Sequence, residues 1–595
     1  MALNDAEIEN LLRGDMSDIE DFNDDEDDLN EEQIIIQHIA EITEFIDLNN
    51  AEMDNLEREQ CLLDGEISLT QDLLNKSDNT EEADVEKENE QLPANWVTGS
   101  WENQKYPFNS MMSAPPVEPH TPLEYFKQFF DSKIVENIVY QTNLYSVQKN
   151  GSSINTNSNE MEQFFGMHMC MSVIKMPAYR MYWAQYTKYS MISDTMSRNR
   201  FTALRTHVHF NDNTNCFPST DIRHDKLFKI RPFIDAIQHN FKLIEPEEHL
   251  AIDEIIIPFK GRSSMKQYNK SKPHKWGIKM FALASKSGIV HDFEIYVGKG
   301  TVKSSTNLGL SGDIVIRLSE IIPKNKNFKL SFDNWFTSYN LIVSLKNHGI
   351  LGVGTVRSNR LSGCQFENDK NLKKSGRGSY DTKIDTTNAI VACKWFDNKT
   401  VHLVSNYIGP EPLDQVQRWS MADKSRIPIE RPAIVKEYNS FMGAIDLHDM
   451  LVEIYRTDIK CKRYYIRIIF HIIDMCIVNS WLMYKRHCKQ LNIIKHDSLL
   501  IFKMNIALGL LKAGKDKINT RKSSLTPPSK NRYKRSNAPV PDVRFDGYQH
   551  WPELSDDKKR CKFCVQPYSR TKCSKCNVAL CFNSSRNCFK SYHEK

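Results

Sequence analysis

Two aspartates lie inside segments whose other residues are apolar and typical of β-strands. Asp253 interrupts LAIDEIIIPF, and Asp333 follows the strand-like residues of FKLSFDNWF. A carboxylate in such surroundings is costly unless it is paired or bound to a cation, so for a lone strand aspartate the simplest expectation is a salt bridge. Two such acids on neighbouring strands favour a different explanation, in which both are metal ligands.

A third acid, Asp446, lies in the helix-like segment YNSFMGAIDLHDM, and Asp449 follows three residues later on the same face. Such pairs are common on acidic helices and indicate little by themselves. Combined with the strand acids, they provide the oxygen ligands that Mg²⁺ or Mn²⁺ prefers. Two such ions can activate a water or a 3′ hydroxyl and stabilise the leaving oxygen of a phosphodiester displacement. We therefore predict a divalent-metal site formed by Asp253, Asp333, Asp446 and Asp449.

A basic segment, PFKGRSSMKQYNKSKPHKWGIKM, follows Asp253. Its cations suit a phosphate backbone, and its aromatic side chains can stack on bases displaced from a duplex. The alternative is a solvated basic loop without a partner. The residues that we predict to contact nucleic acid are Lys260, Arg262, Lys270, Lys272, Lys275, Trp276 and Lys279.

Six of the 14 cysteines lie close together near the C-terminus. Their spacing is typical of structural zinc, with two Cys-x2-Cys pairs followed by further ligands, in the order Cys561, Cys564, Cys573, Cys576, Cys581, Cys588 and His593. Seven ligands are one short of two tetrahedral sites. His550 is our candidate for the eighth, and a plain surface histidine is the alternative. The spacing leaves open which ligands share an ion, and metal binding should supply much of the folding energy of so small a module.

The elements that must position the acids begin at His249, where the apolar period changes from helical to strand-like. From there the chain predicts three strands, a helix, a strand, a helix and a strand. This is the order of a mixed α/β sheet and of the ribonuclease H fold. We therefore predict an α/β multidomain protein with a ribonuclease H-like catalytic core.

Composition predicts the remaining organisation. We expect an acidic disordered region over residues 1–117, helical segments over 118–248 and 456–511, the catalytic domain over 249–356 and 437–455, a mostly β insertion over 357–436, a basic linker over 512–541 and a cysteine-rich zinc domain over 542–595. Arg198, Arg200 and Arg205 give one helical segment a basic face, for which surface solvation is the default explanation.

The 595 residues are 40% hydrophobic and 26% charged, which suits several globular domains. The net charge of +2 conceals an acidic N-terminal end and basic segments elsewhere. No run approaches the roughly 20 apolar residues of a membrane span, and the N-terminus lacks the pattern of a signal peptide. We therefore expect an intracellular protein without a membrane segment.

Several blocks together resemble the signature of piggyBac-family transposases. They are LAIDEIIIPFKGR, NKSKPHKWGIKM, SFDNWFTS, GTVRSN and YNSFMGAIDLHDM, in the family's order, and TPLEYFKQFF and MSRNRF extend the resemblance back to about Thr121. The resemblance implies that Asp253, Asp333 and Asp446 are the catalytic triad and Asp449 a fourth acid near the metals. It also implies a homodimer whose helical segments on both sides of the core pack together, bind DNA and dimerise.

The resemblance implies an enzyme that nicks double-stranded DNA at a transposon's terminal inverted repeats. The freed 3′ hydroxyl would form a hairpin on the element, and the reopened end would join TTAA targets. For the zinc module it implies recognition of transposon-end DNA, which is supported by Lys559, Arg560, Lys562, Arg570, Lys572 and Lys575. A histone-tail reader or a dimer contact would also suit that module.

Three functions are consistent with the sequence. The first is a cut-and-paste transposase that uses Mg²⁺ or Mn²⁺ at the acids and two structural Zn²⁺ ions. The second is a domesticated, catalytically silent protein that binds DNA or chromatin, and the third is a zinc-dependent interaction protein. The basic residues between Arg521 and Arg535 form a nuclear localisation signal or a solvated linker, and we expect the protein in the nucleus.

Overall fold

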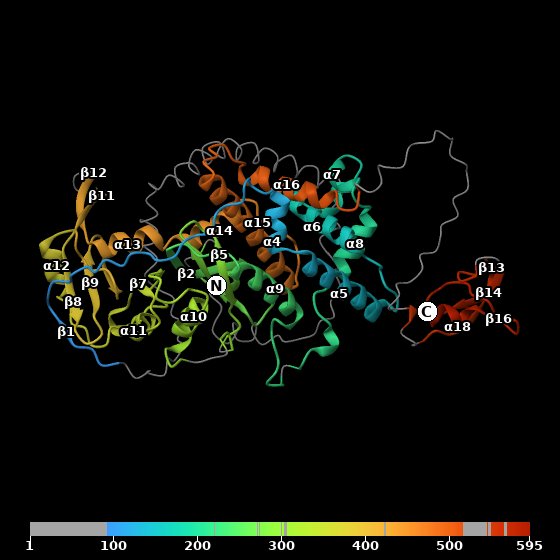
Figure 1. Ribbon diagram of the computed structural model, residues 1–595, viewed down its shortest axis with the longest axis horizontal. Coiled ribbons are helices and arrows are strands. Elements are labelled where there is room, and N and C mark those ends of the chain that lie inside the picture. Colours follow the sequence, from blue (N-terminus) through green and yellow to red (C-terminus); the bar gives the residue numbers. More distant parts are fainter. Residues whose placement is uncertain are drawn as a thin grey trace, which may run out of the picture. The chain divides into compact units, whose positions relative to one another are not determined.

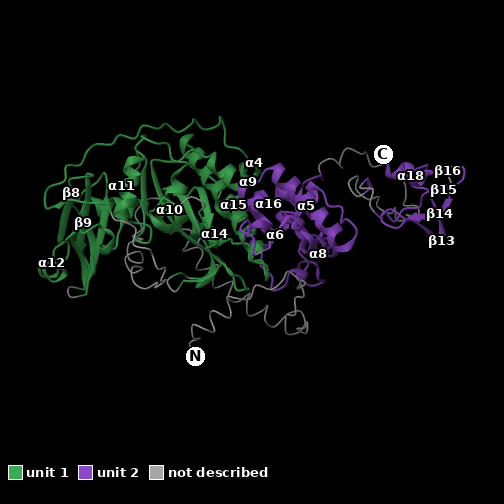
Figure 2. Cartoon of the chain, turned by 90° about the horizontal axis from the view of Figure 1, so that it is seen from below, with its two compact units in different colours: residues 1–129, 237–502 green, residues 130–236, 503–595 purple. Residues whose placement is uncertain are grey.

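The computed structural model describes residues 92–515, 544–545, 549–564 and 568–594, except 219, 270–271, 273, 299, 303–305 and 422–423. Most of the predicted acidic region, most of the basic linker and Lys270 lie outside the described residues. The chain divides into two compact units, one formed by residues 1–129 and 237–502 and the other by residues 130–236 and 503–595 (Figure 2).

The first unit contains a ten-stranded mixed sheet in the order β1-β8-β9-β10-β7-β6-β2-β4-β3, with β5 also paired to β4 (Figure 1). Strand β6 is parallel to both β2 and β7, and the other neighbouring strands are antiparallel. The strands are β1 (Trp96–Val97), β2 (His249–Pro258), β3 (Lys266–Tyr268), β4 (Trp276–Ser285), β5 (Val290–Ile295), β6 (Lys329–Phe332), β7 (Leu351–Thr355), β8 (Tyr380–Asp385), β9 (Ile390–Phe396) and β10 (Thr400–Ser405).

The predicted order of strands and helices is present between β2 and β7. The two helices that it includes are α10 (Gly309–Ser319) and α11 (Tyr339–Asn347), and β3 is a short addition. Strand β2 is buried along most of its length, as expected where residues from both faces of a sheet are covered. Gly277 allows β2 and β4 to approach closely, because a Cβ there would lie 2.4 Å from the carbonyl oxygen of Ile257.

Strands from residues 357–436 extend the main sheet, although we expected them to form an inserted module. Strand β10 pairs with β7, and β9 and β8 continue the sheet beyond it. The backbone N–H and C=O groups on the outer edge of β7 are therefore paired with β10. The segment also contains helix α12 (Asp369–Ser375) and a separate hairpin of β11 (Asp414–Ser420) and β12 (Ser425–Arg431).

Three more helices of the first unit matter for the site: α13 (Ala433–Phe441), α14 (Ala444–Ile454) and α15 (Tyr464–Gln490). Helix α15 packs against α14, β2 and α4 (Pro122–Phe129). Among the described residues, α15 is the one helix that is long enough and apolar enough to cross a membrane. Our expectation that no segment approaches this composition was therefore wrong. Because 94% of its most apolar window is buried inside the protein, α15 has the character of a core helix.

The second unit is helical before its C-terminal part. Its main helices are α5 (Ser132–Asn150), α6 (Ser158–Val173), α7 (Ser190–Ser193), α8 (Arg198–His207) and the end of α16 (Leu499–Leu511). Helices α6 and α16 approach closely at Gly166, where a Cβ would lie 2.9 Å from that of Leu510.

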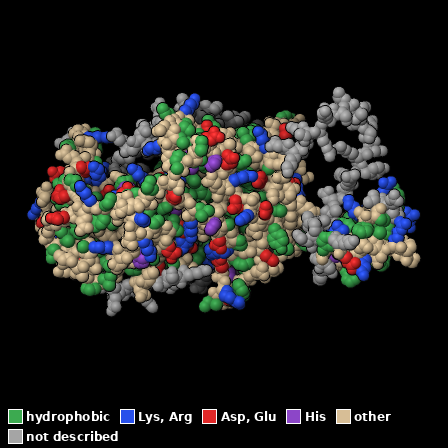
Figure 3. Space-filling view, viewed as in Figure 1, with side chains coloured by type: hydrophobic (Ala, Val, Ile, Leu, Met, Phe, Trp, Pro, Cys, Tyr) green, Lys and Arg blue, Asp and Glu red, His purple; other side chains and the backbone are tan. Residues whose placement is uncertain are grey.

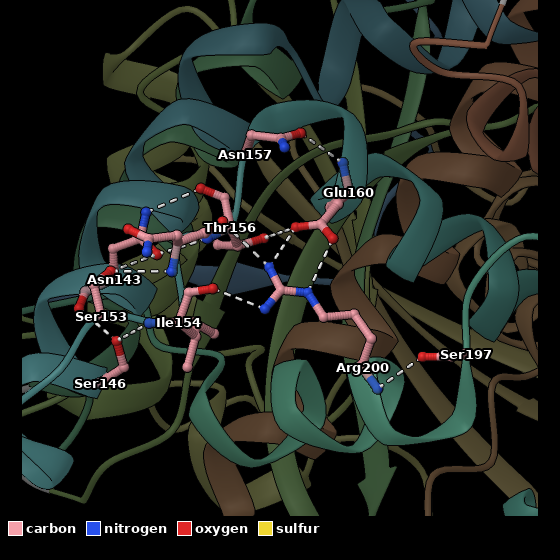
Figure 4. A network of polar contacts seen from close by, with 10 residues as sticks. Asn143, Ser146, Ser153, Ile154, Thr156, Asn157, Glu160, Ser197 and Arg200 are labelled. Carbon is pink, nitrogen blue, oxygen red and sulfur yellow. Dashed lines mark hydrogen bonds and ion pairs between the residues drawn. The ribbon is translucent and has the colours of Figure 1, made fainter. Parts of the chain in front are cut away.

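Arg200, on the basic face noted in the sequence, has a structural role. Its guanidinium pairs with both carboxylate oxygens of Glu160 and donates to the carbonyl oxygens of Ile154 and Asn155, which ties α8 to α6 and to the loop before it (Figure 4). Arg205 is 7% exposed and lies over the Tyr179 ring at 4.5 Å. These two side chains are therefore not a solvated surface.

The C-terminal part of the second unit is small. It consists of β13 (Pro552–Arg560), β14 (Tyr568–Cys573), β15 (Phe582–Asn583), β16 (Arg586–Asn587) and α18 (Cys588–His593). Its strands form two-stranded hairpins, and Lys and Arg side chains gather over this segment in Figure 3. Its described residues form an apolar cluster that includes five of the cysteines.

Candidate active site and metal centres

Asp253 and Asp333 occupy equivalent positions on neighbouring parallel strands. The last residues paired between β2 and β6 are Ile252 and Phe332, and each aspartate directly follows. Their backbone surroundings fix both carboxylates, since Glu254 N–H donates to Asp253 at 2.8 Å and Trp335 N–H donates to Asp333 at 2.9 Å. The sheet therefore brings together two acids that are 80 residues apart in the numbering of the chain.

Helix α14 adds the third and fourth acids. Asp446 lies in its first turn and Asp449 one turn later, and the helix packs against β2 and β4. Burial raises the pKa of Asp449 to about 6, and the neighbouring Asp446 carboxylate acts in the same direction. The predicted acids on the sheet and on this helix thus belong to one electrostatic cluster.

Burial also dominates the electrostatics of the strand acids. It raises the pKa of Asp253 well above its ordinary range, and the carboxylates of Asp333 and Asp446 add to that rise. It raises the pKa of Asp333 to about 6, with Glu254 as the next cause and the backbone N–H groups of Trp335 and Phe336 opposing. Carboxyl groups that are so costly to ionise without a cation are suitable ligands for one.

Lys272 lies among these acids. Its ammonium is 3.6 Å from Asp446 Oδ1 and donates to the Glu254 carbonyl oxygen at 3.2 Å, with the side chain only 10% exposed. Burial opposes the charge, but the carboxylates of Asp253 and Asp446 outweigh it and raise the Lys272 pKa. The sequence indicated a nucleic-acid contact for this lysine, whereas the structure places it within the acid cluster.

Glu254 is a site residue that sequence reasoning did not single out. Its carboxylate accepts from Asn269 Nδ2 at 2.8 Å and pairs with Lys279 Nζ at 3.1 Å. Burial opposes ionisation, but the lysines at 279 and 272 hold the Glu254 pKa below its ordinary value. The available signal was its place beside Asp253 in an apolar strand. Lys279, predicted to contact DNA, is 9% exposed and engaged here instead.

The other predicted DNA contacts that the structure describes are exposed. Lys260, Arg262 and Lys275 lie on the surface, and Trp276 is 44% exposed. The Trp276 ring lies 4.9 Å from that of Tyr268, and Lys266 Nζ lies 5.0 Å from the Trp276 centroid. Cationic and aromatic groups thus occur together where β3 pairs with the start of β4.

The C-terminal ligands form two groups, which resolves the pairing that the spacing left open. The first contains Cys561, Cys564, Cys581 and Cys588, and the second contains His550, Cys573, Cys576 and His593. In each group all ligand atoms lie within 4.8 Å of one another, a criterion that the acids of the sheet do not meet within the described residues. The two sets are interleaved along the chain.

The donor chemistry of both groups fits zinc, because S₄ and N₂S₂ sets are typical of tetrahedral Zn²⁺. In the second group, Cys576 Sγ lies 3.4 Å from both His550 Nδ1 and His593 Nε2. A hydrogen bond from Cys576, followed by other donors, lowers the Cys573 pKa to about 4, and backbone donors lower that of Cys561 to about 7 despite burial. Thiolates are the form that binds metal, so these groups could hold metal ions such as zinc.

Comparisons with known proteins agree with this architecture. The family described as Transposase IS4 matches residues 121–481. Human PiggyBac transposable element-derived protein 3 is 30% identical over 483 residues, which cover 80% of this chain and 78% of that protein. Human PiggyBac transposable element-derived protein 2 is 29% identical over 449 residues, which cover 75% of this chain and 72% of that protein.

A solved structure shares the fold. It is a cryo-EM structure of a piggyBac transposase synaptic complex with hairpin DNA, with a TM-score of 0.56 and 22% identity over 79% of this chain and 97% of that chain. Together with the match over residues 121–481 and the human relatives, it identifies the mixed α/β architecture. The chain therefore belongs to the piggyBac group of the Transposase IS4 family.

Proposed function

We propose that this chain is a cut-and-paste DNA transposase whose catalytic domain is ribonuclease H-like. It excises a transposon through 3′ hydroxyl attack and hairpin formation at the element's ends and integrates it at TTAA targets. The observation that carries the proposal is the convergence of Asp253, Asp333, Asp446 and Asp449 in one cluster within a transposase-family chain.

The acids fit hard divalent cations. Asp253, Asp333 and Asp446, with Asp449, offer only carboxylate oxygens, which Mg²⁺ and Mn²⁺ prefer, and burial makes these carboxylates costly to leave uncompensated. The chemistry that such bound cations supply is activation of an attacking oxygen and stabilisation of a leaving oxygen.

The chain's own residues position the reacting groups. Hydrogen bonds from backbone N–H groups orient the carboxylates of Asp253 and Asp333. We propose that the exposed cations Lys260, Arg262 and Lys275 hold the DNA backbone and that Trp276 and Tyr268 stack on an unpaired base. Lys270 belongs to the same proposal on sequence grounds.

The C-terminal module is proposed to bind transposon-end DNA, with two zinc ions as its structural centres. Exposed cations on and beside β13, including Lys559, Arg560 and Lys562, support this choice over a histone-tail reader. The relative in the solved structure is described as a synaptic complex with hairpin DNA, which supports double-stranded DNA as partner and a homodimer as the working assembly. We propose the nucleus as its location.

The test uses the full chain, loaded with zinc, and a DNA fragment that carries the inverted repeats flanking its gene. With Mg²⁺ or Mn²⁺ we expect nicking at the repeat ends and a hairpin product on denaturing gels. Asp253→Ala and Asp333→Asn should abolish both products, whereas the exposed Glu320→Gln should not. Cleavage that survives both aspartate substitutions would contradict the proposed site.

One alternative is favoured by a specific observation. The human relatives are named as proteins derived from a transposable element, which suits a domesticated DNA- or chromatin-binding protein without cleavage activity. The same assay separates the two functions, because a domesticated protein should retain specific DNA binding and give no nicked product. Flanking TTAA and inverted repeats around the gene would favour the mobile enzyme.

A further inference from the structure

Lys272 stands out because a lysine is an unusual group to find inside a metal site. Its ammonium lies 3.6 Å from Asp446 Oδ1, and its side chain is 10% exposed. Burying an ammonium is costly unless carboxylates surround it. The charges of Asp253, Asp446, Glu254 and Asp449 all favour the charged ammonium, and Asp446 is its ion-pair partner.

A hydrogen bond to the backbone also holds the Lys272 side chain in position. Its ammonium donates to the backbone carbonyl oxygen of Glu254 at 3.2 Å, and that residue follows Asp253 on β2. The Glu254 carboxylate is compensated separately by Lys279 at 3.1 Å and Asn269 at 2.8 Å. Glu254 thus has partners besides Lys272, and the largest favourable interactions of Lys272 are with Asp253 and Asp446.

A divalent ion on Asp446 would lie close to this ammonium. Mg²⁺ binds oxygen at about 2.1 Å, so an ion on the oxygen that faces Lys272 would lie within roughly 6 Å of its charge. Like charges at that separation repel, and the repulsion is weakly screened where both are buried. Metal and lysine therefore compete for the same carboxylates.

We propose that Lys272 is an internal counter-ion, which holds the acid cluster together without metal and weakens the binding of the divalent ion that replaces it. The inference rests on the proposed function in taking the acids as metal ligands. It assigns Lys272 a positioning role that acts through Asp446 and Asp253.

The experiment measures Mn²⁺ affinity by calorimetry, using full-length protein whose zinc groups are already loaded. Lys272→Met should bind Mn²⁺ at least about tenfold more tightly than the wild type, since both the competition and the stabilisation of the metal-free cluster are lost. Its metal-free melting temperature should be lower and its rise on adding Mn²⁺ larger. Lys272→Arg, which keeps the charge, should return both values toward the wild type, and the exposed Lys324→Met is the matched control.

Unchanged or weaker Mn²⁺ binding by Lys272→Met would overturn the inference. If Lys272→Met does not fold, a comparison of Lys272→Arg with Lys272→Gln decides in the same way. Suppose that cleavage requires Asp333 but that Lys272→Met binds Mn²⁺ with unaltered affinity. The inference would then be wrong, and the proposed function would stand. If Lys272→Met binds Mn²⁺ more tightly but the wild-type protein never cleaves DNA, the inference would stand and the proposed function would be wrong.

Discussion

The acid cluster and the C-terminal ligand groups are built in opposite ways. The acids come from two strands and a helix that are far apart in the sequence, and they rest on a large core around β2 and β6. The C-terminal ligands all lie between His550 and His593, and the apolar cluster formed by the described residues there includes cysteine ligands. If both regions bind metal as proposed, the first is folded before its ion binds, whereas the folding of the second depends on its ions.

The largest expected effect is therefore that of removing zinc. A chelator or Cys573→Ser should unfold residues 549–594 and leave the sheet folded, because apparent binding energies of structural zinc are about 10–16 kcal/mol. Hydrogen exchange with mass spectrometry checks this directly, with protection expected to be lost in β14 and kept in β2 and β6. Cys216→Ser, at an exposed cysteine outside both ligand groups, is the control. Protection of β14 that survives chelation would end the contrast between the two regions.

The acid cluster should respond in the opposite sense. The Asp333 pKa is raised to about 6 by burial and Glu254, so its ionised form destabilises the metal-free fold above about pH 4 and increasingly to pH 6. Asp333→Asn removes that cost and should stabilise the metal-free protein at pH 7 by ~3 kcal/mol. Thermal unfolding of zinc-loaded protein should show a higher melting temperature and no further rise with Mn²⁺, with Glu320→Gln as control. A lower melting temperature would mean that this site, too, depends on its ligand for folding.

For both regions the sequence predicted most of the candidate ligands, but it did not predict their three-dimensional arrangement. Asp253 and Asp333 could be identified from the sequence because each is an acidic residue in an otherwise apolar strand segment. Lys272 left no such pattern, since its contacts with Asp446 and Glu254 arise only in the folded chain. The ligand groups were visible from spacing, but their interleaved pairing is a property of the three-dimensional path.

The extent of the sheet was also hidden in the sequence. Strands from residues 357–436 alternate and turn as an independent module would, and only their pairing shows that β10 continues the main sheet from β7. Edge pairing between distant segments depends on backbone groups that every residue carries, so side-chain patterns do not report it. The described part of the insertion therefore looked separate in sequence and is continuous in structure.

Acid should weaken the C-terminal module by protonating its thiolates, whereas in the sheet unit the destabilising effect of His291 opposes the stabilising protonation of Asp333. His291 is fully buried in the sheet unit, between Ser285 Oγ at 2.6 Å and the Ile244 carbonyl oxygen at 3.2 Å, and burial lowers its pKa to about 3. The unfolded chain, with an ordinary histidine pKa near 6.5, takes up the proton first. Stability present above pH 6.5 is then lost toward pH 3, by about 1.4 kcal/mol per pH unit for this one group.

Urea unfolding of the sheet unit between pH 7 and pH 5, followed by hydrogen exchange in β4 and β5, measures this loss. His291→Gln keeps a polar side chain without the proton uptake. Lowering the pH should therefore reduce the free energy of unfolding of this variant by less than that of the wild type. The zinc module in the same samples should instead lose protection as its thiolates are protonated. An equal pH slope in His291→Gln and wild type would assign the acid sensitivity of the sheet to other groups.

The smallest effect tests whether both regions bind DNA by the same means. Lys275, directly before β4, and Lys562, shortly after β13, are both exposed, so each should contribute one phosphate contact when DNA is bound. Lys275→Ala and Lys562→Ala should each weaken binding a few-fold and reduce the slope of log affinity against log salt by about 0.9. Fluorescence anisotropy across a salt series measures this slope. Lys272→Ala should leave it unchanged, because that ammonium is enclosed by carboxylates, and a reduced slope there would turn Lys272 from a counter-ion of the acids into a contact with DNA.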